Sequence, residues 1–122
     1  MSVSDRNTDW RKKLREEIKG KARTEIERVK MPERAASERV KSQRLEVNTG
    51  LTEEMARREA SRCMDCVNPT CMEGCPVGID IPGFIKNIER GEIGEAAAVL
   101  KQTSALPAVC GRVCPQEKQC ES

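Results

Sequence analysis

The sequence contains no histidine and no tyrosine, and it has a single tryptophan and a single phenylalanine. With so few aromatic side chains, any hydrophobic core must be small and aliphatic. A nucleic-acid footprint would need a dense basic patch, ideally interleaved with aromatics. The formal net charge is only +2, with a mild basic excess in the first half and an acidic excess in the second. We therefore expect no nucleic-acid partner.

Long apolar runs are also absent. No stretch approaches the roughly 20 residues that cross a bilayer. The N-terminal sequence MSVSDRNTDWRKK lacks the apolar segment of a signal peptide. These absences predict a cytoplasmic protein without a membrane partner. Thiols stay reduced in the cytoplasm and an odd number fits disulfide pairing poorly, so the seven cysteines indicate metal or redox chemistry.

The cysteines all lie in the second half of the chain. This change in composition near Gly50 predicts two parts. Residues 1–50 form a charged helical N-terminal extension that is partly ordered, and residues 51–122 form an α-helical module that carries the cysteines. At 122 residues the chain is at most one ordinary domain.

Helical patterns fill most of the remaining sequence, and no strand-like alternation occurs, so we expect an all-α fold. In the extension we expect one helix over residues 9–30, with an apolar stripe from Trp10 to Val29, and a polar helix over residues 33–44. In the module, Thr52 should cap a helix that runs into the cysteines.

An αα-hairpin is the clearest pattern in the module. A helix should begin at Asp80 and end at Gly91, and a second helix should follow directly. Its apolar positions follow the i, i+3, i+4, i+7 rule in both helices: Ile81, Phe84, Ile85 and Ile88, then Ile93, Ala96, Ala97 and Leu100. Folding back at Gly91 should bring the last three cysteines beside the first four.

The cysteines form two groups. The first, RCMDCVNPTCMEGCP, has the spacing C-x2-C-x4-C-x3-C-P, and the second has C-x3-C-P-x4-C. One alternative is a zinc-stabilised helical interaction module. A structural zinc site needs four Cys or His ligands, commonly in two C-x2-C pairs, whereas this chain has one such pair and no histidine. Two 4Fe–4S clusters fit better, because the cysteine before proline ligates the other cluster in bacterial two-cluster ferredoxins.

The stretches ASRCMDCVNPTCMEGCPVGIDIPGFI and LPAVCGRVCPQEKQCE resemble a known family. It is the N-terminal iron–sulfur domain of NADPH-dependent glutamate synthase small subunits, which also occurs in dihydropyrimidine dehydrogenase and in flavin-containing NAD(P)H:ferredoxin oxidoreductases. The resemblance covers about residues 31–122, from MPERAASERVKSQRLEV onward. It implies an α-helical ferredoxin-like module with two 4Fe–4S clusters.

The resemblance also implies the ligands of each cluster. Cys63, Cys66 and Cys71 would bind cluster one. Cys75, Cys114 and Cys120 would bind cluster two, with Cys110 near the clusters and a candidate for a fourth ligand. The family has one further ligand for each cluster beyond the position of Ser122, so we expect a chain that is truncated at its C-terminal end.

The function that the resemblance implies is electron transfer between FAD and a partner site. FAD and NADPH would bind to further domains of the same chain, and the partner would be a large glutamate synthase subunit or another electron-accepting subunit. This chain contains no G-x-G-x-x-G phosphate loop and no nucleophile–base pair. We therefore expect an oxidoreductase module, acting in glutamate biosynthesis, that is not catalytic by itself.

Overall fold

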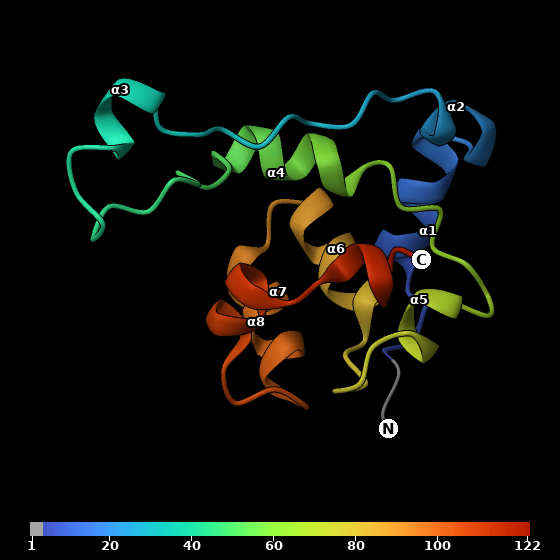
Figure 1. Cartoon of the computed structure of the whole chain (residues 1–122). Coiled ribbons are helices and arrows are strands. Elements are labelled where there is room, and N and C mark those ends of the chain that lie inside the picture. Colours follow the sequence, from blue (N-terminus) through green and yellow to red (C-terminus); the bar gives the residue numbers. More distant parts are fainter. Residues whose placement is uncertain (1–3) are drawn as a thin grey trace.

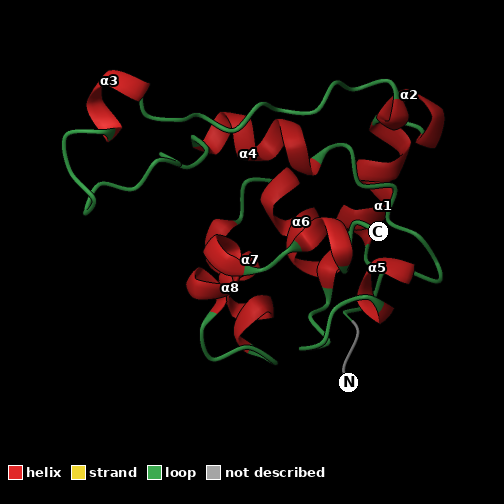
Figure 2. Ribbon diagram, in the orientation of Figure 1, coloured by secondary structure: helices red, strands yellow, loops and turns green. Residues whose placement is uncertain are grey.

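The computed structural model describes residues 4–122, and within that range all the regular elements are helices joined by loops (Figures 1 and 2). Within it, the extended backbone makes one isolated bridge, between Glu33 and Asn48, and no strand. This confirms the all-α prediction. In chain order the elements are α1 (Asp9–Glu17), α2 (Gly20–Thr24), α3 (Ala36–Arg39), α4 (Glu53–Ala60), α5 (Thr70–Glu73), α6 (Ile81–Glu89), α7 (Ile93–Lys101), α8 (Pro107–Val113) and the 3-10 helix η1 (Gln116–Lys118).

The αα-hairpin is present as expected. The Asp80 side chain caps α6 by accepting a hydrogen bond from the Gly83 N–H at 3.0 Å. Gly91 ends the helix with a φ of +88°, a left-handed conformation that glycine adopts without a steric penalty. The chain then reverses into α7, which packs against α6, while α4 packs on another side of α6. Helix α6 therefore lies at the centre of the module.

Thr52 caps α4 as predicted, with its hydroxyl oxygen accepting a hydrogen bond from the Met55 N–H at 3.2 Å. Glu53 and Glu54 occupy the first turn, where they complement the helix dipole. Helix α4 ends at Ala60, three residues before the first cysteine. The local signals of the sequence thus place the entry to the cysteine region correctly.

The single helix predicted over residues 9–30 is wrong. The chain leaves the helical conformation at Ile18 and Lys19, resumes it at Gly20, and ends it at Thr24. Gly20 weakens a helix. The guanidinium of Arg23 also donates a hydrogen bond at 2.8 Å to the carbonyl of Ile18, which a continuous helix would use for its own backbone. A side-chain contact thus replaces a helical hydrogen bond at the break.

The polar helix predicted over residues 33–44 is also wrong in extent, because only Ala36–Arg39 is helical. None of the residues of α3 is buried, so no packed apolar face extends the helix. The flanking chain instead forms a projecting loop closed at its base, where the Arg34 N–H donates to the Val47 carbonyl at 2.7 Å and the Thr49 N–H donates to the Pro32 carbonyl at 3.0 Å. Figure 1 shows this loop extending away from the other helices.

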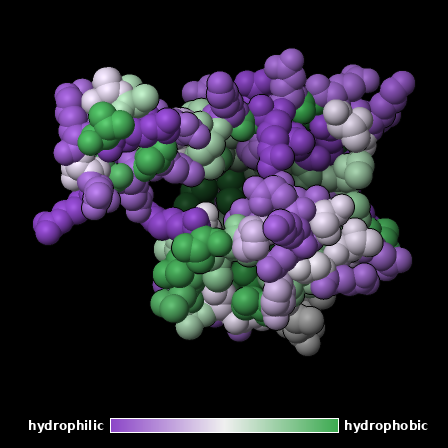
Figure 3. Space-filling model, viewed as in Figure 1, coloured by the Kyte–Doolittle hydropathy of each residue, from purple (hydrophilic) through white to green (hydrophobic). Residues whose placement is uncertain are grey.

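The interior contains few apolar residues. Among the described residues, the buried hydrophobic side chains are Ala60, Ile79, Ala96 and Val99. The apolar stripes expected on the 9–30 segment and on α6 are mostly half-buried, whereas several charged residues are fully buried. Figure 3 shows hydrophilic side chains over α1, α2 and α4 and a hydrophobic patch over α7 and α8. The buried polar and charged residues are Arg11, Arg23, Asp65, Asp80, Lys86, Asn87, Glu89 and Ser104.

Within residues 4–122, no helix combines the length and the apolar character needed to cross a membrane.

Candidate functional site

The first cysteine segment, residues 63–75, begins at the end of α4. The Cys63 N–H donates to the Ala60 carbonyl at 3.1 Å, which continues the last turn of the helix. Cys71 lies in the short helix α5, and the Cys75 N–H donates to the Met72 carbonyl at 3.2 Å. Cys66 is exposed, while the other three cysteines of this segment are partly buried. The last turn of α4 and the short helix α5 thus fix the backbone of this segment at Cys63 and at Cys71.

The second cysteine segment, residues 110–120, begins in α8. The sulfur of Cys110 lies 3.9 Å from the Ser104 hydroxyl. Cys114 ends α8, and its sulfur lies 3.7 Å from the Gln119 side-chain oxygen. All seven cysteines of the chain are free thiols. The segment therefore presents three unpaired thiols from a helix and the turn after it.

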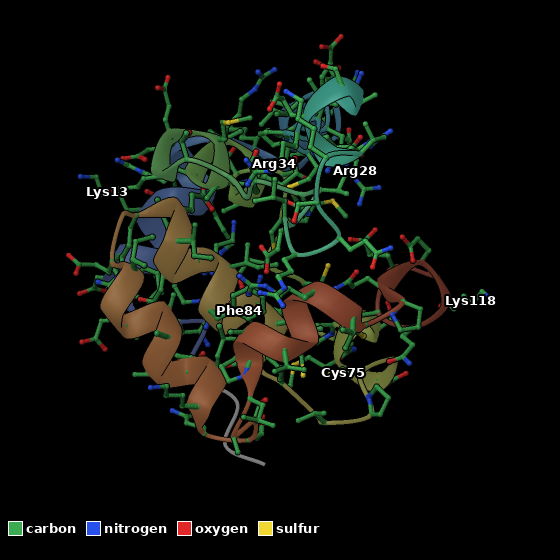
Figure 4. All side chains as sticks on the ribbon, turned by 60° about the vertical axis from the view of Figure 1, so that its left-hand side comes forward. Lys13, Arg28, Arg34, Cys75, Phe84 and Lys118 are labelled. Carbon is green, nitrogen blue, oxygen red and sulfur yellow. The ribbon has the colours of Figure 1, made fainter. Side chains whose placement is uncertain are left out.

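The two cysteine segments touch at Gly74. A Cβ at this position would lie 2.7 Å from the backbone oxygen of Gln119 and 3.1 Å from the Cα of Cys120, too close for any other residue without movement. This contact confirms the prediction that the hairpin brings the two segments together. In Figure 4, Cys75 lies on the side of the molecule where the C-terminal ribbon meets the ribbon of the first cysteine segment.

The thiols influence one another electrostatically. Burial raises the pKa of Cys71, and the charges of Cys63, Cys66 and Cys120 raise it further. Burial also raises the pKa of Cys120, as do the charges of Glu121, Cys114 and Cys75. Like charges raise a thiol pKa only at short range. Cys71 is therefore near Cys63, Cys66 and Cys120, and Cys120 is also near Cys75 and Cys114, so the thiols of the two segments adjoin.

No three cysteine, aspartate or glutamate side chains in the described part of the chain come together as ligands of a single metal ion. A four-iron cluster makes a different demand. Its thiolates bind separate irons, so the sulfurs lie farther apart than the four ligands around one zinc ion. Soft thiolates without histidine or carboxylate partners suit iron–sulfur clusters, and the seven free thiols in two adjoining segments fit that group.

A buried carboxylate between Cys63 and Cys66 is a residue that sequence reasoning missed. Asp65 is completely buried and has a φ of +54°. Its carboxylate accepts hydrogen bonds from Arg11 and Arg15 of α1, and its carbonyl accepts two from Arg6, at 3.1 and 2.7 Å. Burial acts to raise the pKa of Asp65, but Arg11 and then Arg15 outweigh it, so the pKa lies below its ordinary value.

A second buried network lies on the other side of this turn. Glu89 of α6 accepts hydrogen bonds from Arg23 at 2.8 Å and from Lys86 at 2.6 Å. The same Lys86 ammonium group donates to the Cys63 carbonyl, and Arg23 donates to the Ser61 carbonyl. Arg23 and Lys86 are almost fully inaccessible to solvent. Two cations therefore bind backbone oxygens in the turn that leads from α4 to the first cysteine.

Together these contacts follow a regular pattern. A cationic side chain donates a hydrogen bond to the carbonyl of every second residue in this turn, at Ser61, Cys63 and Asp65. The donors come from α2, α6 and the segment before α1. Burial raises the pKa of Cys63, and a backbone hydrogen bond from Asp65 and the charge of Lys86 act in the opposite direction. No sequence signal distinguishes these cations from the many exposed ones in the chain.

Comparisons with known proteins place the chain among iron–sulfur domains. The family described as "Dihydropyrimidine dehydrogenase domain II, 4Fe-4S cluster" matches residues 39–122. The glutamate synthase [NADPH] small chain of Escherichia coli K12 is 41% identical over 97 residues, which are 80% of this chain and 20% of that protein.

Two further relatives come from the same organism. The putative oxidoreductase UacF is 43% identical over 88 residues, or 71% of this chain and 14% of that protein. The NAD-dependent dihydropyrimidine dehydrogenase subunit PreT is 40% identical over 77 residues, or 63% of this chain and 19% of that protein. The chain thus spans about a fifth or less of the length of these curated relatives.

Proposed function

The chain belongs to the dihydropyrimidine dehydrogenase domain II family of 4Fe–4S proteins, and from this premise we propose that it carries electrons through two such clusters. A bound 4Fe–4S cluster accepts and releases single electrons at potentials from about −700 to +450 mV, depending on its surroundings. The remaining roles fall to the protein: it supplies thiolates, holds them apart at fixed positions and limits access of water.

We assign Cys63, Cys66 and Cys71 to cluster one, and Cys75, Cys114 and Cys120 to cluster two. This division rests on the spacing of the cysteines and on the family resemblance; electrostatically the two sets adjoin, since Cys120 also acts on Cys71. Cys110 is the seventh thiol and a candidate for a fourth ligand.

The observation that carries the proposal is the contact of the two cysteine segments at Gly74. Cluster two needs thiols from both segments, so it requires that they adjoin. The hairpin of α6 and α7 supports this arrangement, since it leads the chain back from Cys75 toward α8. The contact at Cys120 also supports an arrangement of the proposed sites side by side, which electron transfer between two clusters requires.

In the wider protein, we propose that the module passes electrons between an FAD and a partner site, as part of a cytoplasmic oxidoreductase of the glutamate synthase (NADPH) small-subunit type. FAD and NADPH would be held by other domains of that protein, and a large subunit would receive the electrons. The relatives support this assignment because two kinds of oxidoreductase subunit share the module.

Anaerobic reconstitution with ferrous iron and sulfide tests the cluster proposal. With a small thiol in the buffer to complete the ligand sets, we expect a brown protein with iron and sulfide in near-equal amounts and approaching about eight of each per chain. The matched pair of variants is Cys71→Ser, a proposed ligand, and Thr70→Ser, an exposed neighbour in α5 that carries no thiol. Cys71→Ser should lose about half of the iron, and Thr70→Ser should keep most of it. Colourless protein that carries zinc in stoichiometric amount would refute the proposal.

A further inference from the structure

We propose that the N-terminal segment, residues 4–17, is part of the first iron–sulfur site: its arginines hold Asp65 as a positioning residue for the Cys63–Cys66 turn and place a net positive charge beside cluster one. This inference rests on the function proposed above. It assigns a role to a segment that lies outside the residues matched by the family, which begin at residue 39.

The arginines converge on one residue from one helix and the turn before it. Arg11 and Arg15 are four residues apart, so they project from the same face of α1. Both bind the Asp65 carboxylate, and Arg6 binds its carbonyl with two N–H groups. Arg11 is 1% exposed and Asp65 is fully buried. A buried ion pair of this kind fixes geometry, because removing either partner leaves an unpaired charge in the interior.

The backbone of Asp65 explains why this geometry matters for the cysteines. Its φ of +54° lies in the left-handed region, which residues other than glycine occupy at some cost and which aspartate tolerates better than most. This conformation turns the chain between Cys63 and Cys66. The arginines therefore hold both the side chain and the carbonyl of a residue that lies between two proposed ligands.

The charge of the network is unbalanced. Two guanidinium groups bind the Asp65 carboxylate and a third binds its carbonyl, while Asp80 joins the network through Ser4, so three positive charges face two negative ones and one positive charge is in excess. A 4Fe–4S cluster with thiolate ligands is negative and becomes more so on reduction, and local net charge is one of the factors that set its potential. Because Coulomb energies are large where water is excluded, this excess should favour the reduced form. The N-terminal segment should therefore raise the potential of cluster one.

The test compares two variants that remove the same charge from the same helix. Arg15→Gln removes a guanidinium that binds Asp65, and its side chain is 21% exposed, so the fold should tolerate the change. Lys13→Gln removes a cation whose side chain is 76% exposed and whose nearest carboxylate partner is Glu17, at 3.8 Å. Arg15→Lys restores the charge without the planar fork. Each full chain is reconstituted, and both clusters are followed by redox titration with EPR.

We expect Arg15→Gln to shift one of the two cluster potentials to a more negative value and to leave the other unchanged. Lys13→Gln should leave both at the wild-type values, and Arg15→Lys should recover most of the shift. Equal potentials in wild type and Arg15→Gln would overturn the electrostatic part of the proposal. Equal shifts in Arg15→Gln and Lys13→Gln would overturn it as well, because the effect would then not depend on Asp65.

Asp65→Asn tests the positioning role without relying on the clusters. Asparagine keeps the size of the side chain and tolerates a positive φ, but it leaves the buried Arg11 without a counterion. In the protein without iron, trypsin should cleave residues 4–17 much faster in this variant than in wild type, while Glu17→Gln, which removes an exposed carboxylate and keeps every trypsin site, should show no such increase. Unchanged cleavage would refute the positioning role. If wild type itself takes up no iron and sulfide, the proposed function fails first, and the two failures are thereby distinguished.

Discussion

Replacing Glu89 by glutamine should lower the free energy of unfolding strongly, because Glu89 binds two buried cations, one of them far away in the sequence. Glu89 lies between two buried cations and accepts a hydrogen bond from each, from Arg23 at 2.8 Å and from Lys86 at 2.6 Å. The side chains of the three residues are 7%, 1% and 0% exposed. Glutamine has the same shape and keeps one oxygen acceptor, so the change removes mainly the negative charge.

The magnitude follows from the burial of this triad. Removing one partner of a buried ion pair costs about 3–5 kcal/mol, because the remaining charge is left without compensation. Here two cations lose their counterion, while the retained oxygen can still accept from one of them, so we expect about 3–5 kcal/mol for Glu89→Gln. A domain of this size has a free energy of unfolding of about 6–18 kcal/mol. The melting temperature should fall by roughly 10–20 °C.

The assay is urea unfolding of the iron-free protein with reduced thiols, followed by far-UV circular dichroism. The matched control is Glu17→Gln, which removes a carboxylate that is 53% exposed and paired with Lys13 at 3.8 Å. The control should change the free energy of unfolding by no more than about 1 kcal/mol. If Glu89→Gln unfolds at the same urea concentration as Glu17→Gln, the buried triad does not stabilise the fold and the reasoning is refuted.

Three further substitutions test the geometry of the module. Gly74→Ala should lower iron loading, because its Cβ would lie 2.7 Å from a backbone oxygen of the second cysteine segment; Gly94→Ala in α7, with open space around it, should not. Gly91→Ala should lower the free energy of unfolding by about 1–2 kcal/mol in urea titrations, because its φ is +88°. Asp80→Ala should cost about 1–2 kcal/mol by the same measurement, since it removes the cap of α6.

The cysteine module was largely predictable because its signals are local. Asp80 and Thr52 are residues of the type that caps helices, and Gly91 is the residue that ends them, so the boundaries of α4, α6 and α7 follow from a few positions. The short connection at Gly91 then predicted that the two cysteine segments lie side by side. The ligand assignments themselves depend on spacing and stay a prediction until iron is measured.

The N-terminal half was not predictable in the same way. The apolar stripe from Trp10 to Val29 suggested one long helix, but the fully buried side chains of this segment are Arg11 and Arg23. A pattern of hydrophobicity treats every arginine as a surface residue. Which arginine is buried depends on partners such as Asp65 and Glu89, more than fifty residues away. Such pairs cannot be read from the periodicity of a single segment.

The structure buries cations rather than apolar side chains around the turn before Cys66, and the backbone of that turn explains why. An iron–sulfur site needs an open, irregular backbone around its cysteines, and the carbonyls of the turn that follows the end of α4 at Ala60 lie outside any helix. Apolar packing could cover those oxygens but could not bind them, and a buried carbonyl without a partner is costly. Arg23, Lys86 and Arg6 each donate to one of them, so the buried charges satisfy the backbone at the same places where they fix the proposed ligands.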